Sequence, residues 1–147
     1  MKLTKNFTLS EFVESETAER KGIDNTPSQL VIDNIKIAAE GMQKIRELLD
    51  NPIFISSGYR SPKLNKAIGG SATSAHCFGY AVDFKCPNFG APYEVTKKII
   101  DSGLKFDQVI EEGGNSGWIH ISFDPRLRQE KLSAKFVNGR AIYTEFK

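Results

Sequence analysis

The sequence contains few cysteines and no long hydrophobic run. Its two cysteines, Cys77 and Cys86, are too few for a disulfide framework, so we expect both to be free, partly buried thiols. No apolar run approaches the roughly 20 residues that a helix needs to span a bilayer, which argues against membrane insertion. Residues 1–7 lack an apolar core and a small-residue cleavage site. We therefore expect a protein that is synthesised in the cytoplasm without a signal peptide.

The sequence also lacks an excess of charge of either sign. Its 20 basic and 18 acidic side chains leave a net charge of +2, whereas a nucleic-acid-binding protein is expected to carry a concentrated basic face. Nucleic acid is therefore not an expected partner. A length of 147 residues, with no repeat, low-complexity segment or long linker, predicts a single domain over residues 1–147. We expect this domain to be a monomer.

The order of apolar residues and chain breakers predicts an α+β fold. The clearest helix begins at Pro27, a residue favoured at the first helical position, and runs to about Asp50. An earlier helix is expected near residues 8–12, capped by Thr8 or Ser10. The remaining elements are helices at 63–68 and 92–102, strands at 53–57, 80–86, 108–112 and 118–123, and a hairpin at 135–146 that turns at Asn138-Gly139. This order favours helices packed on a small antiparallel sheet.

The chain has only two histidines, and each lies in or beside a predicted strand. His76 occupies a polar loop before the strand at 80–86, in which Asp83 lies between two hydrophobic residues. His120 alternates with apolar residues in the strand at 118–123. A carboxylate within an apolar strand needs a partner, because burying a bare charge is very costly. Two imidazoles and one carboxylate are a common ligand set for catalytic zinc, with the fourth position left for water.

The same residues also allow a simpler interpretation. A single histidine in a strand is more often a hydrogen-bonded structural residue, and a His–Asp pair is often only a salt bridge. Spacing alone therefore leaves a metal site and a structural pair both open. Cys77 adjoins His76, but adjacent side chains on an extended segment point in opposite directions, so both would rarely reach one ion.

The segments around these residues resemble a known family. The motifs are Ser-Gly-Tyr-Arg-Ser at residues 57–61, Ser-x-His-x-x-Gly-x-Ala-x-Asp at 74–83 and Trp-x-His at 118–120, with further similarity at 7–12 and 22–27. Together they are similar to the zinc D-alanyl-D-alanine carboxypeptidase family of murein peptidases, in particular its small phage-type branch. That family includes the L-alanyl-D-glutamate endopeptidases of phage lysins. The resemblance covers roughly residues 7–125.

The resemblance implies a fold like that of Hedgehog and D-Ala-D-Ala peptidase domains, with a Zn2+ ion as cofactor. It assigns His76, Asp83 and His120 to the zinc. It assigns Arg60 to the carboxylate or carbonyl oxygen of the substrate, a role that suits the rigid fork of a guanidinium. The alternative for Arg60 is a surface ion pair. Ser74 would hydrogen-bond the substrate or a ligand, or would merely cap its loop.

One position departs from the family pattern. Many relatives carry the catalytic acid three residues before the last histidine ligand, where this chain has Gly117, which offers no acid–base group. The nearest carboxylates are Glu111 and Glu112, just before a glycine-rich turn. In the phage-type branch a glutamate before such a turn fills the role, and it aligns best with Glu112. We therefore predict Glu112 as the catalytic base and keep Glu111 as the alternative, because strand alternation alone does not choose between them.

These assignments imply a zinc metallopeptidase that hydrolyses bonds in the peptide stems of peptidoglycan, as a D-Ala-D-Ala carboxypeptidase does. Two alternatives stay open. The first is a murein endopeptidase, or endolysin, that cuts a bond such as L-Ala–D-Glu. The second is a non-catalytic zinc domain of Hedgehog type, although such a domain would have no need of Glu112. The branch resemblance and the missing signal peptide point to a phage or prophage gene whose product acts on the cell wall.

Overall fold

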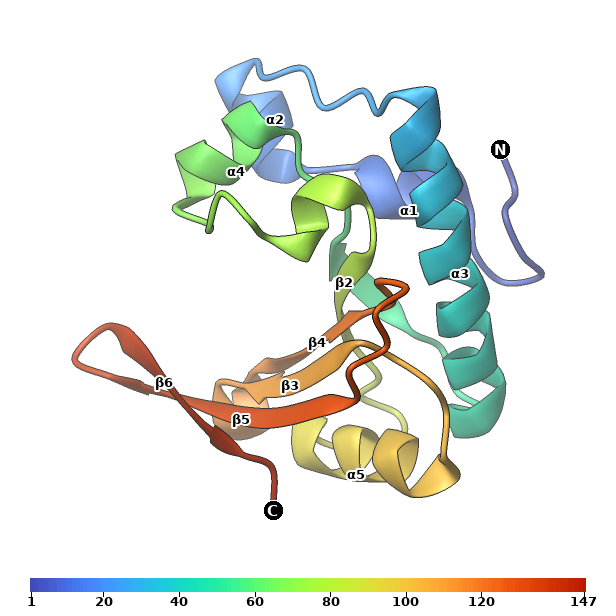
Figure 1. Ribbon diagram of the computed structural model, residues 1–147, viewed down its shortest axis with the longest axis vertical. Helices are drawn as coiled ribbons and strands as arrows, with labels where there is room; N and C mark the ends of the chain where they lie inside the picture. The colour runs from blue at the N-terminus through green and yellow to red at the C-terminus, as the bar shows by residue number, and fades with distance from the viewer.

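The computed structural model describes residues 1–147 and has the predicted α+β architecture (Figure 1). The helices are α1 (Leu9–Val13), α2 (Glu16–Lys21), α3 (Gln29–Leu49), α4 (Pro62–Ile68) and α5 (Pro92–Ser102), with short 3-10 helices η1 (Ala75–Phe78) and η2 (Gly114–Ser116). The strands are β1 (Phe54–Ser57), β2 (Ala81–Lys85), β3 (Gln108–Glu112), β4 (Trp118–Ser122), β5 (Glu130–Val137) and β6 (Arg140–Glu145). No helix combines the length and the apolar composition that a membrane crossing requires.

The six strands form one mixed sheet in the order β1-β2-β4-β3-β5-β6. All neighbouring strands are antiparallel except β3 and β5, which run parallel, with Gln108 opposite Glu130 and Glu112 opposite Ala134. The prediction of a purely antiparallel sheet is therefore wrong at this pair. Strand β4 already has β2 and β3 as neighbours, so the chain that follows it joins the sheet at the free edge of β3. This next strand, β5, runs in the same direction as β3.

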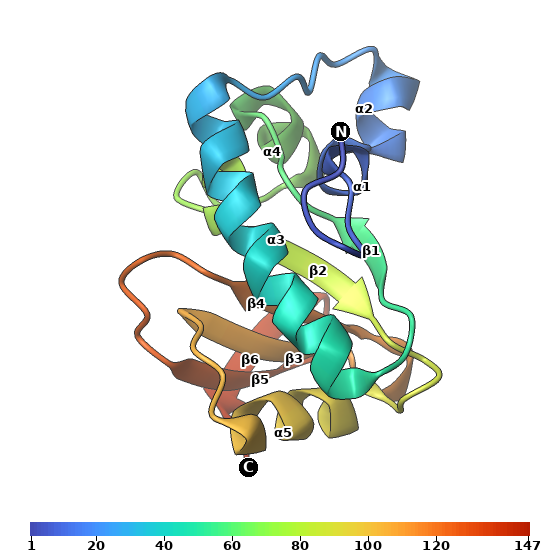
Figure 2. The same ribbon diagram turned by 90° about the vertical axis from the view of Figure 1, so that its right-hand side faces the viewer.

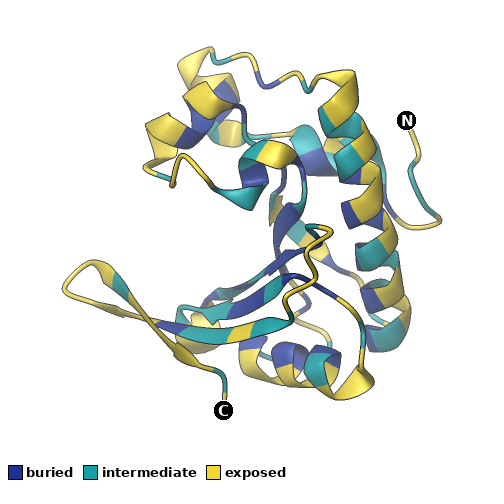
Figure 3. Ribbon diagram, in the orientation of Figure 1, coloured by how far each residue is buried: buried dark blue, intermediate teal, exposed yellow.

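Strands β5 and β6 form a hairpin that projects from the body of the molecule and is mostly exposed (Figure 3). Asn138 and Gly139 have φ values of 52° and 78°, and a two-residue type I′ turn requires positive φ at both positions. The predicted turn is thus confirmed. Strand β5 begins at Glu130, earlier than the predicted residue 135, because its first half pairs with β3, a partner far away in the sequence.

The start of one helix differs from the prediction, and the cap of another agrees with it. Helix α3 begins at Gln29, two residues later than predicted, because Ser28 is its cap and accepts a hydrogen bond from the backbone N–H of Val31 at 3.3 Å. Pro27 therefore precedes the helix. Helix α1 is capped by Thr8, one of the two predicted candidates.

The two faces of the sheet have different neighbours. Helices α3 and α5 lie against one face (Figure 2). The strands β2 and β4 send fully buried side chains into this core: Val82, Phe84, Ile119 and Ile121. Burying each of them stabilises the fold by about 1.5–3 kcal/mol. Because successive strand residues point to opposite faces, Asp83 and His120, which lie between these hydrophobic residues, face away from the two helices.

Candidate metal centre

His76 lies in the short helix η1, whose start and end are set by neighbouring residues. The Oγ of Ser74 accepts a hydrogen bond from the backbone N–H of His76 at 3.2 Å, and Gly79 follows the helix with a φ of 86°. Ser74 thus caps this helix, which is one of its two predicted roles. It also borders the cavity described below. The segment that holds His76 and Cys77 is helical, whereas the sequence argument about these two side chains treated it as extended. The thiol of Cys77 is free and does not belong to the group of converging ligand atoms.

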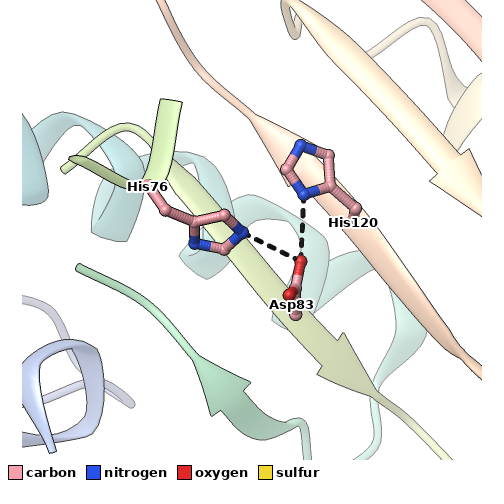
Figure 4. A group of neighbouring side chains, drawn as sticks. All are labelled: His76, Asp83 and His120. Atoms are coloured by element: carbon pink, nitrogen blue, oxygen red, sulfur yellow. Dashed lines mark hydrogen bonds and ion pairs between the residues drawn. The ribbon is translucent and has the colours of Figure 1, made fainter. Parts of the chain in front are cut away.

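Asp83 and His120 lie directly opposite each other on the paired strands β2 and β4. Nδ1 of His120 lies 2.9 Å from Oδ1 of Asp83, and Nε2 of His76 lies 3.2 Å from the same oxygen (Figure 4). The three atoms are all within 4.8 Å of one another. Side chains from η1, β2 and β4 therefore converge on one point, as the sequence predicted.

The hydrogen bonding of His76 suits a cation at this point. Its Nδ1 lies 2.7 Å from the carbonyl oxygen of Gly58, so Nδ1 carries the proton and donates this bond. A neutral His76 then has a lone pair on Nε2, and this lone pair faces Oδ1 of Asp83, which is also an acceptor. A metal ion between the two atoms would relieve this contact and would hold both as ligands. Two imidazole nitrogens and one carboxylate oxygen are a donor set that fits zinc.

Asp83 remains ionised in spite of its burial. Burial raises the pKa of its carboxyl, but the charges that His76 and His120 carry when protonated, and the hydrogen bonds they then donate, outweigh this effect and hold the pKa well below its ordinary value. Its second oxygen, Oδ2, lies 3.3 Å from Nη2 of Arg60. The ionised carboxylate is the form that binds metal ions.

Arg60 is held in place through each of its three nitrogen atoms. Nε donates to Oγ of Ser57 at 3.1 Å, Nη1 donates to Oδ1 of Asn65 at 3.3 Å, and Nη2 donates to Oδ2 of Asp83. The side chain of Arg60 is only 16% exposed, and its carboxylate partner belongs to the converging group, so it does not form the surface ion pair considered above. Asn65 is buried and holds this arrangement. It lies four residues after the Ser-Gly-Tyr-Arg-Ser motif, and the motif gave it no role.

The two candidate glutamates point to opposite faces of the sheet. Glu112 lies opposite Trp118, and its Oε2 accepts a hydrogen bond from the indole Nε1 of Trp118 at 3.1 Å. Burial raises the pKa of the Glu112 carboxyl above its ordinary value, although the charge of His120 acts in the opposite direction. Glu111 instead accepts a hydrogen bond from Oγ of Ser133 at 2.8 Å and does not border the cavity. The face that carries His120 therefore also carries Glu112.

A cavity of about 610 Å³ unites these groups. Among the residues that border it are all the predicted ones: Arg60, Ser74, His76, Asp83, Glu112 and His120. Its wall also includes four residues that the sequence did not single out as functional: Asp107, Arg126, Arg128 and Tyr143. No spacing rule marks these four, because a loop and the projecting hairpin bring them to the cavity from outside the matched motifs.

A comparison with protein families agrees with this geometry. The model of a family described as Peptidase M15 matches residues 5–122, which includes every residue of the converging group. A comparison with curated proteins gives no match. The family match covers most of the chain and confirms the resemblance seen in the motifs. The chain therefore belongs to the peptidase M15 family of zinc murein peptidases.

Proposed function

We propose that this protein is a zinc-dependent peptidase that hydrolyses bonds in peptidoglycan stem peptides, with an activity like that of a D-Ala-D-Ala carboxypeptidase. The observation that carries the proposal is the convergence of His76 Nε2, Asp83 Oδ1 and His120 Nδ1 within 4.8 Å on the wall of a large cavity. The same cavity presents a carboxylate and a guanidinium, from Glu112 and Arg60. Membership of the peptidase M15 family supplies the substrate class.

The three converging side chains are proposed to hold one Zn2+ ion. Zinc bound there would polarise the carbonyl group of the scissile bond and lower the pKa of the attacking water toward neutrality. The hydrogen bond from His76 Nδ1 to the Gly58 carbonyl fixes the imidazole so that Nε2 faces the site. The Arg60 guanidinium in turn orients the Asp83 carboxylate through Oδ2.

Glu112 is proposed as the general base. Its Oε2 is held by the Trp118 indole, which leaves Oε1 without a side-chain partner and free to take a proton from the attacking water. The same carboxyl then gives this proton to the leaving amine nitrogen. Burial raises the pKa of Glu112, and a raised pKa favours holding the proton between these two transfers.

Arg60 is proposed to bind the carbonyl oxygen or the carboxylate of the substrate. Its three bonds to Ser57, Asn65 and Asp83 fix the plane of the guanidinium. Each terminal nitrogen carries two protons, so donors remain for a substrate oxygen. A guanidinium held in one plane costs little further ordering when it binds an oxygen anion.

An endopeptidase is the second candidate, because the floor of the cavity extends on both sides of the metal group. Three pairs of facing residues on β3 and β4 border the cavity: Glu112 and Trp118, Ile110 and His120, and Gln108 and Ser122. The pair that contains His120 is the middle one. A substrate that ends just after the scissile bond needs room on one side only, whereas a bond within the stem, such as L-Ala–D-Glu, needs room on both.

The test is digestion of purified muropeptides with the zinc-loaded protein, followed by mass spectrometry. Release of a single terminal alanine would identify a carboxypeptidase, and separation of L-Ala from D-Glu would identify the endopeptidase. The Glu112→Gln protein with zinc bound is the matched control and should leave the muropeptides intact. If the zinc-loaded wild-type protein cuts no muropeptide, the proposed function is wrong, and a zinc domain that only binds becomes the better explanation.

A further inference from the structure

The cavity continues past the metal group toward a pair of arginines. Beyond His120 on strand β4, the next residue on the same face is Ser122, which pairs with Gln108. This end of the cavity is bordered by Arg126 and Arg128, from the segment between β4 and β5. Both lie outside the part of the chain that matches the family model, which ends at residue 122.

A buried carboxylate anchors this end of the cavity. The side chain of Asp107 is 1% exposed and accepts two hydrogen bonds from the fork of Arg128, from Nε to Oδ1 at 3.0 Å and from Nη2 to Oδ2 at 2.9 Å. The backbone N–H of Arg128 donates to the same carboxylate at 3.0 Å. The charge of Asp107 is therefore neutralised by Arg128, which is fixed as part of the fold.

Arg126 is much less constrained. Its Nη2 lies 3.5 Å from Oδ2 of Asp107, which is long for a hydrogen bond, and its Nε donates to Oδ1 of Asp124 at 3.2 Å. Nη1 has no hydrogen-bond partner in the protein, and the side chain is 61% exposed. The terminal donors of Arg126 are therefore free to bind another group.

The charges at this end favour an anion. The carboxylates of Asp107 and Asp124 balance the charges of Arg126 and Arg128, and a third carboxylate near Arg128, that of Glu130, accepts a hydrogen bond from Gln108. The groups that contact the two arginines are not equally accessible. Asp107 is 1% exposed and Asp124 24%, whereas Arg128 is 42% exposed and Arg126 61%. A ligand in the cavity therefore meets guanidinium donors first, and a carboxylate is the group that best matches their fork.

We propose that Arg126 binds a carboxylate of the substrate and so determines which stem peptides the protein accepts. From His120 to Ser122 is one repeat of the strand, ~7 Å, which equals about two residues of an extended peptide. Because Arg126 borders the cavity beyond Ser122, the carboxylate would lie about two residues or more from the scissile bond. Murein stems offer such a group, since the D-glutamate carries a carboxylate outside the main peptide chain. This inference rests on the proposed function for its substrate class.

The experiment compares two synthetic stem peptides that differ only at the D-glutamate carboxylate, which is either free or amidated. Binding is measured by calorimetry on zinc-loaded protein that carries Glu112→Gln, so that turnover does not interfere, and kcat/KM is measured on active protein. Arg126→Ala removes the guanidinium, and Arg126→Lys keeps the charge without the fork. Arg140→Ala is the matched control, because Arg140 is exposed at the start of β6 and does not border the cavity.

We expect the protein with Arg126 to prefer the free carboxylate by about 10-fold or more, consistent with a charged hydrogen-bonded pair. Arg126→Ala should bind both peptides equally, Arg126→Lys should keep part of the preference, and Arg140→Ala should keep all of it. Equal binding of the two peptides when Arg126 is present, or an unchanged preference in Arg126→Ala, would overturn the inference. If the preference depends on Arg126 but no peptide is cut, the anion site stands and the proposed function fails. If both peptides are cut without any preference, the proposed function stands and the anion site fails.

Discussion

The indole Nε1 of Trp118 donates a hydrogen bond of 3.1 Å to Oε2 of Glu112, directly across the β3–β4 pairing. Trp118 also contacts the ring of Phe136 on the projecting hairpin, with ring centroids 6.0 Å apart. The bond stabilises the ionised form of a carboxyl that burial otherwise drives toward its neutral form. Trp118 is thus placed to set the pH range in which Glu112 acts as a base.

Trp118→Phe tests this relationship. Phenylalanine keeps an aromatic ring against Phe136 but lacks the N–H donor. The donor lowers the pKa of Glu112, so its loss should raise that pKa further. A base is active when ionised, and the acidic limb of the kcat/KM profile should therefore move to higher pH, with a several-fold loss at the acidic end and little change on the plateau. An acidic limb that stays in place would mean that this limb does not report on Glu112.

The pair Glu111→Gln and Glu112→Gln distinguishes the two candidate bases. Glutamine keeps the shape of glutamate but transfers no proton, a loss typically worth about 10²–10⁴ in rate. Glu112→Gln should lose that much in kcat with zinc still bound. Glu111→Gln should lose far less, because Glu111 bonds Ser133 on the other face of the sheet. The assignment is wrong if Glu111→Gln is the inactive protein at equal zinc content.

Arg60→Lys tests the substrate role of the guanidinium. Lysine keeps the positive charge but cannot bond Ser57, Asn65 and Asp83 at once, so the fork that is proposed to meet the substrate is lost. We expect activity to fall by about 10-fold or more with zinc content unchanged. Wild-type activity in this variant would remove Arg60 from the mechanism.

Asp107→Asn addresses the stability of the fold near the cavity. Asp107 is buried, whereas its partner Arg128 is 42% exposed. Removing the negative charge should lower the free energy of unfolding by about 1–3 kcal/mol, the cost of weakening hydrogen bonds to a charged group. Asp101→Asn is the control, because the pair of Asp101 with Lys97 is exposed on both sides and such pairs contribute little. Denaturant unfolding at neutral pH measures both variants.

The pH dependence of the same protein gives a second readout. Burial raises the pKa of Asp107, but the bonds from Arg128 and the nearby Arg126 outweigh it and leave the pKa below its ordinary value. A depressed pKa in the folded state stabilises the fold above the unfolded pKa, and this stability is lost as pH falls through the folded pKa. Asp107→Asn should therefore lose less stability on acidification than wild type. Identical acid profiles would show that Asp107 is not among the groups that cause the acid loss.

The converging side chains could be predicted because they depend on local patterns. Asp83 and His120 each lie between two apolar residues of a strand. Because successive strand residues point to opposite faces, both polar side chains lie on the face away from the core, whatever the strand order is. Helix α5 and the hairpin turn at Asn138-Gly139 follow from equally local signals. The pairing that brings Asp83 opposite His120 needed the family motifs as well.

The departure at Gly117 has a steric reason that only the structure reveals. A Cβ at this position would overlap the backbone carbonyl oxygen of Glu112, because the turn folds the two residues against each other. The close approach leaves no room for the acid that many relatives carry there. The carboxylate that borders the cavity comes instead from the opposite end of the same turn.

The edge of the sheet and the far end of the cavity could not be predicted. The parallel pairing of β3 with β5 depends on which sheet edge is free after β4 is placed, and that is a property of the whole fold. Arg126 and Tyr143 reach the cavity only because the chain after β4 returns to pair β5 with β3, and β6 then pairs with β5. No periodicity in residues 123–147 indicates that these side chains would lie near His120.

The central claim is tested most directly by measuring zinc in the purified protein and in its ligand variants. Elemental analysis should find one zinc per wild-type chain, and X-ray absorption should give nitrogen and oxygen ligands at roughly 2.0–2.2 Å. His76→Ala, Asp83→Ala and His120→Ala should each lose most of the metal, whereas Glu112→Gln should retain it. A wild-type protein that binds no zinc after incubation with the metal, or zinc that stays bound at full content in all three ligand variants, would contradict the proposed metal site.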